Sequence, residues 1–291
     1  MEKIIQKKYK GERSLYGSSN LYIQDTVFGE GESPLKESHD IELNTCLFQW
    51  KYPFWYCRNI KAENCIWFDM ARAGVWYTSN MTVNHAQIQA PKNFRRCDGL
   101  VFDDVIMTNA AETLWHCKNV KMNNVSAKGD YFAMDSSDME IENFSLDGNY
   151  SFDGCKNIII RNSRLLSKDA FWNSENITVY DSFISGEYLG WNSKNLTLVN
   201  CTIESLQGMC YINNLVMKNC KLIDTTLAFE NCTMDAEISG RIESVFNPIE
   251  GTIKADEIEE LIVEKDLVDE SKTKILCAKI NKRSDKPEWK R

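Results

Sequence analysis

Prolines, histidines and long apolar runs are scarce in this sequence, and each shortage excludes a class of protein. The 291 residues include only 5 prolines and 14 glycines, which argues against a linker-rich or collagen-like chain. Residues 1–10 lack the apolar segment of a secretory signal, and no apolar run approaches the roughly 18 residues of a transmembrane helix. We therefore expect a cytoplasmic protein with no membrane partner.

Basic residues and metal-binding motifs are also few. Lys and Arg total 34 against 42 Asp and Glu, a formal net charge of −8, so the chain lacks the basic surface typical of nucleic-acid binding. With 3 histidines and no Cys-x-x-Cys motif, we expect neither a metal site nor another cofactor. The 11 cysteines are an odd number, and we expect reduced thiols rather than disulfides.

A nine-residue phrase recurs along the chain, as in Asn157-Ile-Ile-Ile-Arg-Asn-Ser-Arg-Leu165. We call the first residue of each copy the anchor. The ten steps from the first anchor to the last cover 194 residues, about 19 per copy, which indicates stacked repeating units rather than two globular domains. The anchors are Asn20, Asp40, Asn59, Asn80, Gly99, Asn119, Asp138, Asn157, Asn176, Asn195 and Asn214.

Each copy has the periodicity of a β-strand, because its apolar residues alternate with polar ones. The residues one and three positions after the anchor are apolar in all eleven copies, as Leu21 and Ile23 are in the first. A helical solenoid would need longer repeats and a spacing of about 3.6 residues. Two or three short strands per turn fit the repeat, which therefore predicts a parallel β-helix.

Two polar columns predict where the chain turns. The anchor is Asn, Asp or Gly in every copy, and Asn or Asp predominates five positions later. These residues tolerate the left-handed backbone of a tight corner, and stacked asparagines can hydrogen-bond from one coil to the next. Eight of the 11 cysteines fall in columns of small residues beside the corners, so we expect buried, unreactive thiols.

The segment before each anchor reads as a third strand, and its residue four positions before the anchor is often tryptophan. We call these positions the aromatic column. The residue before each of them is mostly apolar, so strand alternation should turn the aromatic column outward. Exposed aromatic rows usually mark a binding surface, although the column could instead be a structural stack or be covered by the C-terminal segment. We predict a carbohydrate or other extended ligand there, bound by residues of the column and its border: Trp55, Trp76, Arg95, Trp115, Trp172, Trp191, Arg72 and Lys168.

Three acidic residues near this column raise an enzymatic alternative. Asp153 occupies the column itself, and Asp135 and Asp169 fall in flanking positions. Two carboxylates of which one has a raised pKa can perform acid–base chemistry on a glycosidic bond. The sequence therefore leaves open a non-catalytic binding protein and a lyase or glycoside hydrolase that uses the same surface.

Several phrases cluster on the aromatic side, including Gly11-Glu-Arg-Ser-Leu-Tyr16, Tyr52-Pro-Phe-Trp55 and Lys168-Asp-Ala-Phe-Trp172. With Asn247-Pro-Ile-Glu-Gly-Thr-Ile253, they resemble a bacterial domain-of-unknown-function family, family 3737. The resemblance covers roughly residues 1–262, and that family is similar in architecture to the pectin-lyase-like right-handed β-helices. It implies the fold but no reaction, so it assigns no catalytic residue.

Together these observations predict an all-β protein. Residues 1–235 should form a single right-handed parallel β-helix, a solenoid of about eleven to twelve coils. Residues 236–291 should form a C-terminal β cap and a charged tail, because the phrase decays there and a terminal coil needs capping. Nothing in the sequence indicates an oligomeric state.

Overall fold

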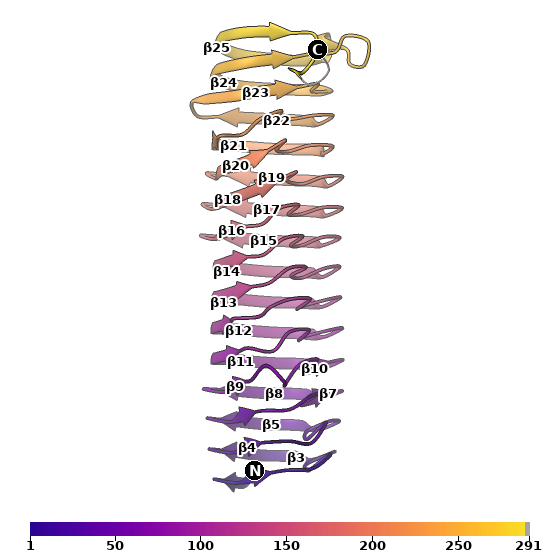
Figure 1. Ribbon diagram of the computed structural model, residues 1–291, viewed down its shortest axis with the longest axis vertical. Helices are drawn as coiled ribbons and strands as arrows, with labels where there is room; N and C mark the ends of the chain where they lie inside the picture. Colours follow the sequence, from indigo (N-terminus) through magenta and orange to yellow (C-terminus); the bar gives the residue numbers. More distant parts are fainter. Residues whose placement is uncertain (289–291) are drawn as a thin grey trace. The chain divides into compact units, whose positions relative to one another are not determined.

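The structure, a computed structural model, describes residues 1–288 and consists of β-strands and turns with one three-residue 3-10 helix (Figure 1). Its contacts divide the chain into two compact units, Met1–Gly148 and Asn149–Arg291. In each unit successive coils pair in parallel, which confirms the predicted all-β parallel β-helix. Residues 289–291 of the predicted tail lie outside the described residues. Within residues 1–288, no helix has the length and apolar character needed to cross a membrane.

In the first unit each coil contributes a longer strand and, after a corner, a shorter one; the two merge into single long strands in the later coils. Figure 1 shows the strands of this unit stacked one above another. The strands are β1 (Glu2–Ile5), β2 (Lys8–Tyr9), β3 (Ser19–Gln24), β4 (Val27–Phe28), β5 (His39–Asn44), β6 (Leu47–Phe48), β7 (Phe54–Trp55), β8 (Arg58–Glu63), β9 (Ile66–Trp67), β10 (Val75–Trp76), β11 (Ser79–Ile88), β12 (Asp98–Met107), β13 (Lys118–Lys128) and β14 (Ser137–Asp147).

The second unit repeats this plan and ends in two long strands joined by a loop that holds the short helix η1. Its elements are β15 (Lys156–Arg161), β16 (Arg164–Leu166), β17 (Glu175–Tyr180), β18 (Phe183–Glu187), β19 (Lys194–Val199), β20 (Thr202–Leu206), β21 (Asn213–Ile223), β22 (Thr233–Ile238), β23 (Arg241–Phe246), β24 (Glu250–Ile262), η1 (Glu270–Lys272) and β25 (Thr273–Ser284).

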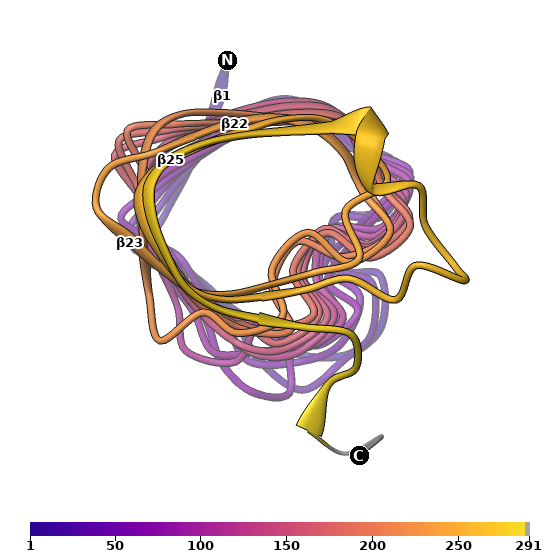
Figure 2. The same cartoon turned by 90° about the horizontal axis from the view of Figure 1, so that it is seen from above.

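The register places each residue of a longer strand against its counterpart in the preceding coil. Leu21 pairs with Ile41, and Ile41 pairs with Ile60. The side chains one and three positions after the anchor are buried in all eleven copies, which confirms the alternation read from the sequence. Figure 2 looks along this interior, in the direction in which the coils of each unit are stacked. Aromatic rings also stack there: the centroids of Phe28 and Phe48 are 5.1 Å apart.

Both predicted corner columns are confirmed, because all eleven anchors and all eleven residues five positions later have positive φ. Three further left-handed columns were not predicted. Two of them lie seven and three positions before the anchor in all eleven copies and hold residues as large as Tyr52 (φ 62°) and Tyr56 (φ 58°). The third lies five positions before the anchor and is left-handed from Phe94 to Met209. A large side chain is strained in this conformation, but the hydrogen bonds between coils hold it there, as the bond of 2.9 Å from Tyr56 N to the Trp76 carbonyl does.

These two extra corners explain why the third side differs from the expected strand. Among the eleven copies the segment is a strand only in β7 and β10, and isolated parallel bridges extend the ladder from Trp76 to Arg95 and from Arg95 to Trp115. Near the C-terminus, β23 also runs into this segment. Elsewhere in the described coils it is mostly turn. The two corners are only four residues apart, and from Phe94 onward a further left-handed residue lies between them, which leaves too little extended backbone for a strand.

The anchor side chains form the expected amide ladder. Asn176 donates to Asn157 Oδ1 at 3.0 Å, Asn195 to Asn176 Oδ1 at 2.8 Å, and Asn214 to Asn195 Oδ1 at 2.8 Å. Each side-chain amide thus donates a hydrogen bond to the amide oxygen of the preceding coil, while the backbone of the same residue forms a corner. Asparagine serves both needs, which accounts for its frequency in the repeat.

The predicted coil count of eleven to twelve was wrong, because the structure has about fifteen. Eight longer strands stack in the first unit (β1, β3, β5, β8, β11, β12, β13 and β14), and seven stack in the second (β15, β17, β19, β21, β22, β24 and β25). The uncounted coils lie at the ends of the chain, where the register puts Met1, Thr233, Glu250 and Lys272 at the anchor position. These residues do not match the phrase, but backbone pairing and buried side chains such as Met234 and Ile253 continue the stack. The predicted boundary between residues 235 and 236 stays a prediction.

The cysteines are packed as their columns predicted. All 11 thiols are free, ten are buried, and Cys277 is half-exposed. Burial raises the pKa of the Cys57 thiol to about 12. Because ten of the thiols are out of solvent, a reagent cannot reach them in the folded protein, and these cysteines fill space at the corners.

We expect a thiol reagent near neutral pH to label one cysteine per chain quickly, at Cys277, and the other ten only as the protein unfolds. Mass spectrometry of the labelled native protein would count the modified thiols. Cys277→Ser provides the matched control, because it should remove the fast phase without affecting the rest. Rapid labelling of several thiols in that variant would contradict the burial.

Candidate functional site on the aromatic column

The aromatic column forms a continuous stack of half-exposed side chains in the first unit. The ring centroids of Trp55 and Trp76 are 5.0 Å apart, and the ring planes are within 6° of parallel. The Arg95 guanidinium lies 5.2 Å from the ring centre of Trp76 and 4.3 Å from that of Trp115. Because these flat groups cover one another's faces, it is mainly their edges that reach solvent.

Four tryptophans of the column also bind the next coil through the indole N–H. The acceptor is in each case the carbonyl of the residue seven positions before the next anchor. The bonds are Trp55 Nε1 to Ala73 O (2.6 Å), Trp76 Nε1 to Lys92 O (3.1 Å), Trp115 Nε1 to Tyr131 O (2.6 Å) and Trp172 Nε1 to Tyr188 O (3.0 Å). They fix the orientation of each ring, so the column holds the coils together as well as presenting a surface.

Arg95 occupies a tryptophan position of the column and, like the tryptophans, donates a hydrogen bond to the residue seven positions before the next anchor. Its Nη2 donates to Glu112 Oε2 at 2.6 Å, and Glu112 stands at the position whose carbonyl accepts an indole N–H in the other coils. Burial alone would raise the pKa of Glu112, but hydrogen bonds from Lys92 and Arg95 hold it below its usual value. The guanidinium is thus enclosed by two indole faces and one ionised carboxylate.

The column resumes in the second unit, where it begins with a carboxylate. Asp153 occupies the position that Arg95 and the tryptophans occupy elsewhere, and its Oδ1 accepts a hydrogen bond of 2.9 Å from Asn173 Nδ2. Trp172 and Trp191 follow with centroids 5.9 Å apart, and Tyr211 stacks on Trp191 at 4.6 Å. In the coil of Asp153, a carboxylate therefore lies where neighbouring coils place a ring.

Asp169 is the most unusual acidic group on this side. Only 8% of its surface is exposed, and its Oδ1 is buried without a hydrogen-bond partner. Burial, followed by the negative charge of Glu187, raises the pKa of this carboxyl group, while Lys168 opposes the shift. The Lys168 ammonium is itself bound to Glu187 Oε1 at 2.9 Å. Asp169 therefore holds its proton to a higher pH than an exposed aspartate would.

The remaining predicted residues lie apart from this group. Asp135 belongs to the first unit, where it is exposed and lies 3.7 Å from His116 Nδ1. Arg72 is exposed and directly precedes Ala73, the residue whose carbonyl accepts the indole N–H of Trp55. The second unit brings Asp153, Asp169, Lys168, Trp172 and Trp191 onto one side. The catalytic alternative in which Asp153 is the main acid–base group and Asp135 its partner stays a prediction.

A row of tyrosines beside the column was missed. Tyr56, Tyr77 and Tyr211 all stand three positions before an anchor and are exposed by 40% or more of their surface. The rings of Tyr56 and Tyr77 stack at 4.8 Å with planes 4° apart. The repeated tyrosine at one position of the repeat was the available signal. It adds exposed hydroxyl groups next to the edges of the indole rings.

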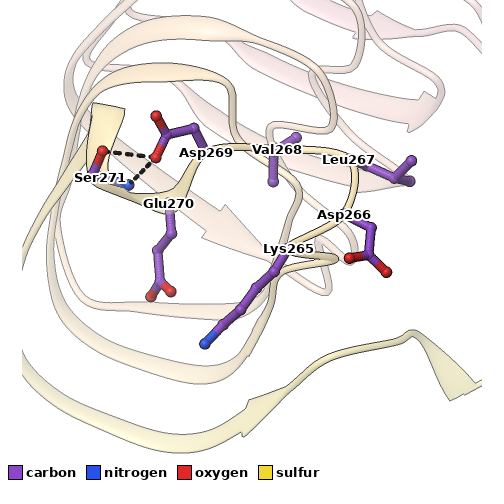
Figure 3. A pocket seen from close by; sticks show the side chains of 7 residues that line it. All are labelled: Lys265, Asp266, Leu267, Val268, Asp269, Glu270 and Ser271. Atoms are coloured by element: carbon purple, nitrogen blue, oxygen red, sulfur yellow. Dashed lines mark hydrogen bonds between the residues drawn. The ribbon is translucent and has the colours of Figure 1, made fainter.

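A large hollow lies elsewhere, in the loop before β25 (Figure 3). Residues 265–271 line about 710 Å³ there, with mixed charges and no aromatic side chain. Asp269 Oδ1 accepts hydrogen bonds from Ser271 N at 3.1 Å and Ser271 Oγ at 2.7 Å, which lowers the pKa of Asp269. Its carboxylate thus caps η1, so the hollow reflects the bend of the loop and does not gather reactive groups.

Metal ligands do not converge in the part of the chain that the structure describes, because no group of three or more His, Cys, Asp or Glu side chains has a suitable geometry. A shallow groove of about 500 Å³ crosses the outer face of β8 and β11–β13 between Lys61 and Lys121. Its apolar floor, which includes the exposed Val101, is small, and the amino groups of both lysines pair with neighbouring glutamates. The aromatic side thus remains the candidate site.

Comparison with known proteins confirms the family resemblance read from the sequence. A family model described as "Protein of unknown function (DUF3737)" matches residues 2–276. No curated protein matches the chain by sequence. Among solved structures, the Streptococcus pneumoniae surface protein and adhesin PfbA is similar, with 7% identity, a TM-score of 0.40, and coverage of 91% of this chain and 88% of that one. The A-module of the Azotobacter vinelandii mannuronan C-5 epimerase AlgE4 is similar with 10% identity, a TM-score of 0.27, and coverage of 98% and 89%.

Proposed function

The chain belongs to the DUF3737 family of proteins of unknown function, and from its own aromatic side we propose that it binds a carbohydrate chain. The observation that carries the proposal is the half-exposed column of indole edges bordered by exposed tyrosine hydroxyls. Indole and phenol rings provide apolar contact for the C–H faces of sugars, and the hydroxyls and amides beside them provide hydrogen bonds. Coils repeat about every 4.8 Å, so successive sugar units would meet similar groups.

A sugar ring would meet the column best in the coil of Asp153. The ring of Trp76 is covered by Trp55 on one face and by Arg95 on the other. Trp172 has an aromatic neighbour of the column on one side, Trp191, and on the other side its neighbour is the short carboxylate of Asp153. A sugar that approaches from this side would contact the indole of Trp172 while its hydroxyl groups reach Asp153 and Asn173. Lys168, in the next coil, is exposed on the same side.

We expect Trp172→Ala to weaken carbohydrate binding about tenfold, because it removes the aromatic contact. Trp172→Phe is the matched variant, since it keeps a flat ring and loses the hydrogen bond to the Tyr188 carbonyl. A glycan array would identify the ligand, calorimetry would give both affinities, and the melting temperature would report on folding. Equal affinity of the native protein and a folded Trp172→Ala variant would contradict binding at this ring.

A second function is favoured by one specific observation, the raised pKa of Asp169. A carboxyl group that keeps its proton can act as a general acid, and Asp153 in the preceding coil could act as the base or nucleophile. The protein would then be a lyase or glycoside hydrolase acting on the chain that it binds. Asp153→Asn should abolish turnover and leave binding largely intact, because it changes charge more than shape. Unchanged turnover in that variant, measured with reducing-end and unsaturated-product assays, would contradict a catalytic role of Asp153.

A further inference from the structure

The Arg95 position shows how this fold encloses a cation. The guanidinium lies between the faces of Trp76 and Trp115, and its Nη2 donates to the Glu112 carboxylate of the following coil at 2.6 Å. Carboxylate and aromatic faces are the two groups that recognise a cation most effectively, the first through charge and the second through the ring quadrupole. The chain thus contains its own example of a filled cation site.

The coil of Asp153 keeps part of this arrangement without the guanidinium. Asp153 and Trp172 are aligned in adjacent coils in the same way as Arg95 and Trp115. The backbone N–H of Gly154, the residue after Asp153, donates to the carbonyl of Trp172 at 2.8 Å. The backbone N–H of Arg96, the residue after Arg95, likewise donates to the carbonyl of Trp115 at 2.9 Å. Asp169 likewise occupies the position of Glu112, seven before the anchor. The aromatic face and the carboxylate of the next coil are therefore retained, while the guanidinium is replaced by a second carboxylate.

Two independent contacts support a ligand at this position. The ring of Tyr150 stands nearly perpendicular to that of Trp172, at 81° with centroids 6.3 Å apart, which gives the position two aromatic walls. In addition, Asp169 is more than nine-tenths buried, and its Oδ1 has no hydrogen-bond partner. The Lys168 ammonium also acts electrostatically on Asp169 and Tyr150, but it is bound to Glu187 Oε1 at 2.9 Å.

We propose that Asp153, Asp169, Trp172 and Tyr150 form a site for an amino group of the ligand, so that the carbohydrate bound by this protein carries free amino sugars. A sugar ammonium would take the place that the Arg95 guanidinium takes in its own coil, against an indole face and within reach of a carboxylate of the next coil. This inference rests on the proposed carbohydrate binding and adds the chemistry of the sugar. Neutral and N-acetylated chains lack the charge that the two carboxylates would pair with.

The test compares three tetrasaccharides of similar length: a chitosan oligomer with free amines, its N-acetylated chitin counterpart, and the neutral cellulose oligomer. We expect the native protein to bind the chitosan oligomer at least about tenfold more tightly than the other two. Asp153→Asn should remove most of this preference. Asp235→Asn is the matched control, because Asp235 is an exposed aspartate of the same unit that lies on a longer strand, away from the aromatic column.

The outcomes separate this inference from the function on which it rests. Equal affinity for all three oligomers, or a preference that survives Asp153→Asn, would overturn the amino-sugar site and leave carbohydrate binding in place. If no oligomer binds, tetramethylammonium decides the question by itself. An increase in melting temperature that is present in the native protein and absent in Asp153→Asn would keep the cation site and reject carbohydrate as the ligand, whereas no increase would reject both.

Discussion

Replacing Arg95 by alanine should lower the free energy of unfolding by about 2–3 kcal/mol. The substitution removes the guanidinium between the two indole rings and the hydrogen bond of 2.6 Å to Glu112. It also leaves a partly buried carboxylate without its closest partner, and the cost of such a loss exceeds that of an exposed ion pair. The side chain of Arg95 is only 20% exposed, which reduces screening by solvent. Urea unfolding followed by circular dichroism would measure the change.

The neighbouring arginine provides the control. Arg96 is exposed and lies three positions before the anchor, outside the stack. Arg96→Ala should change stability by no more than about 0.5 kcal/mol. Arg95→Lys should fall between the two, since an ammonium keeps the charge but cannot lie flat between two rings. If Arg95→Ala and Arg96→Ala had equal, small effects, the stack of Trp76, Arg95 and Trp115 would not contribute to stability.

Asp169→Asn should stabilise the protein at neutral pH by about 1–2 kcal/mol, because the native carboxylate is buried with one oxygen unsatisfied. The effect should depend on pH with a definite sign. Burial and Glu187 raise the pKa of Asp169 in the folded state, so the unfolded chain releases this proton at a lower pH than the folded one. The native protein therefore loses stability as the pH rises from the unfolded value through the raised folded value. Below the unfolded value both states are protonated, and the difference between variant and native protein should vanish.

Melting temperatures of Asp169→Asn and native protein between pH 4 and 8 would test this, with Asp235→Asn as the exposed control. The advantage of the asparagine should grow with pH at position 169 and be absent at position 235. A loss of stability at neutral pH in Asp169→Asn would mean that the carboxylate is satisfied in the folded protein. A gain would show that the native residue is kept at a cost to stability, as expected of a group with a function.

Much of the fold could be read from the sequence because the relevant interactions are local or repeat at a constant interval. The alternation at Leu21 and Ile23 marks a buried strand face in every copy, and asparagine at the anchor and five positions later marks two corners. The coils at the ends could not be counted, because Met1 and Glu250 hold the anchor position by backbone pairing without matching the phrase. The left-handed corners at Tyr52 and Tyr56 were equally hidden, since their residue types do not favour that conformation.

The candidate site could likewise be predicted only in part from the sequence. The sequence indicated which residues share a column, and so placed Trp55, Trp76 and Arg95 together. It did not show that the indole of Trp55 binds Ala73 of the next coil, or that Tyr56 and Tyr77 stand beside the column. It also favoured Asp153 and did not distinguish the settings of Asp135 and Asp169, although Asp169 is buried and Asp135 is exposed beside His116. Burial and hydrogen bonding depend on side chains about one coil away, which no local pattern records.

The sequence by itself therefore determined the parallel β-helix, its interior and the columns that face outward, because a repeat of about 19 residues brings equivalent positions into register wherever it occurs. Only the tertiary structure decided what each outward column does. The stacking of Arg95 between two indoles and the isolation of the Asp169 carboxyl depend on contacts with the adjacent coils. Those contacts are set by side-chain length and orientation across the stack, which vary from coil to coil while the backbone repeats.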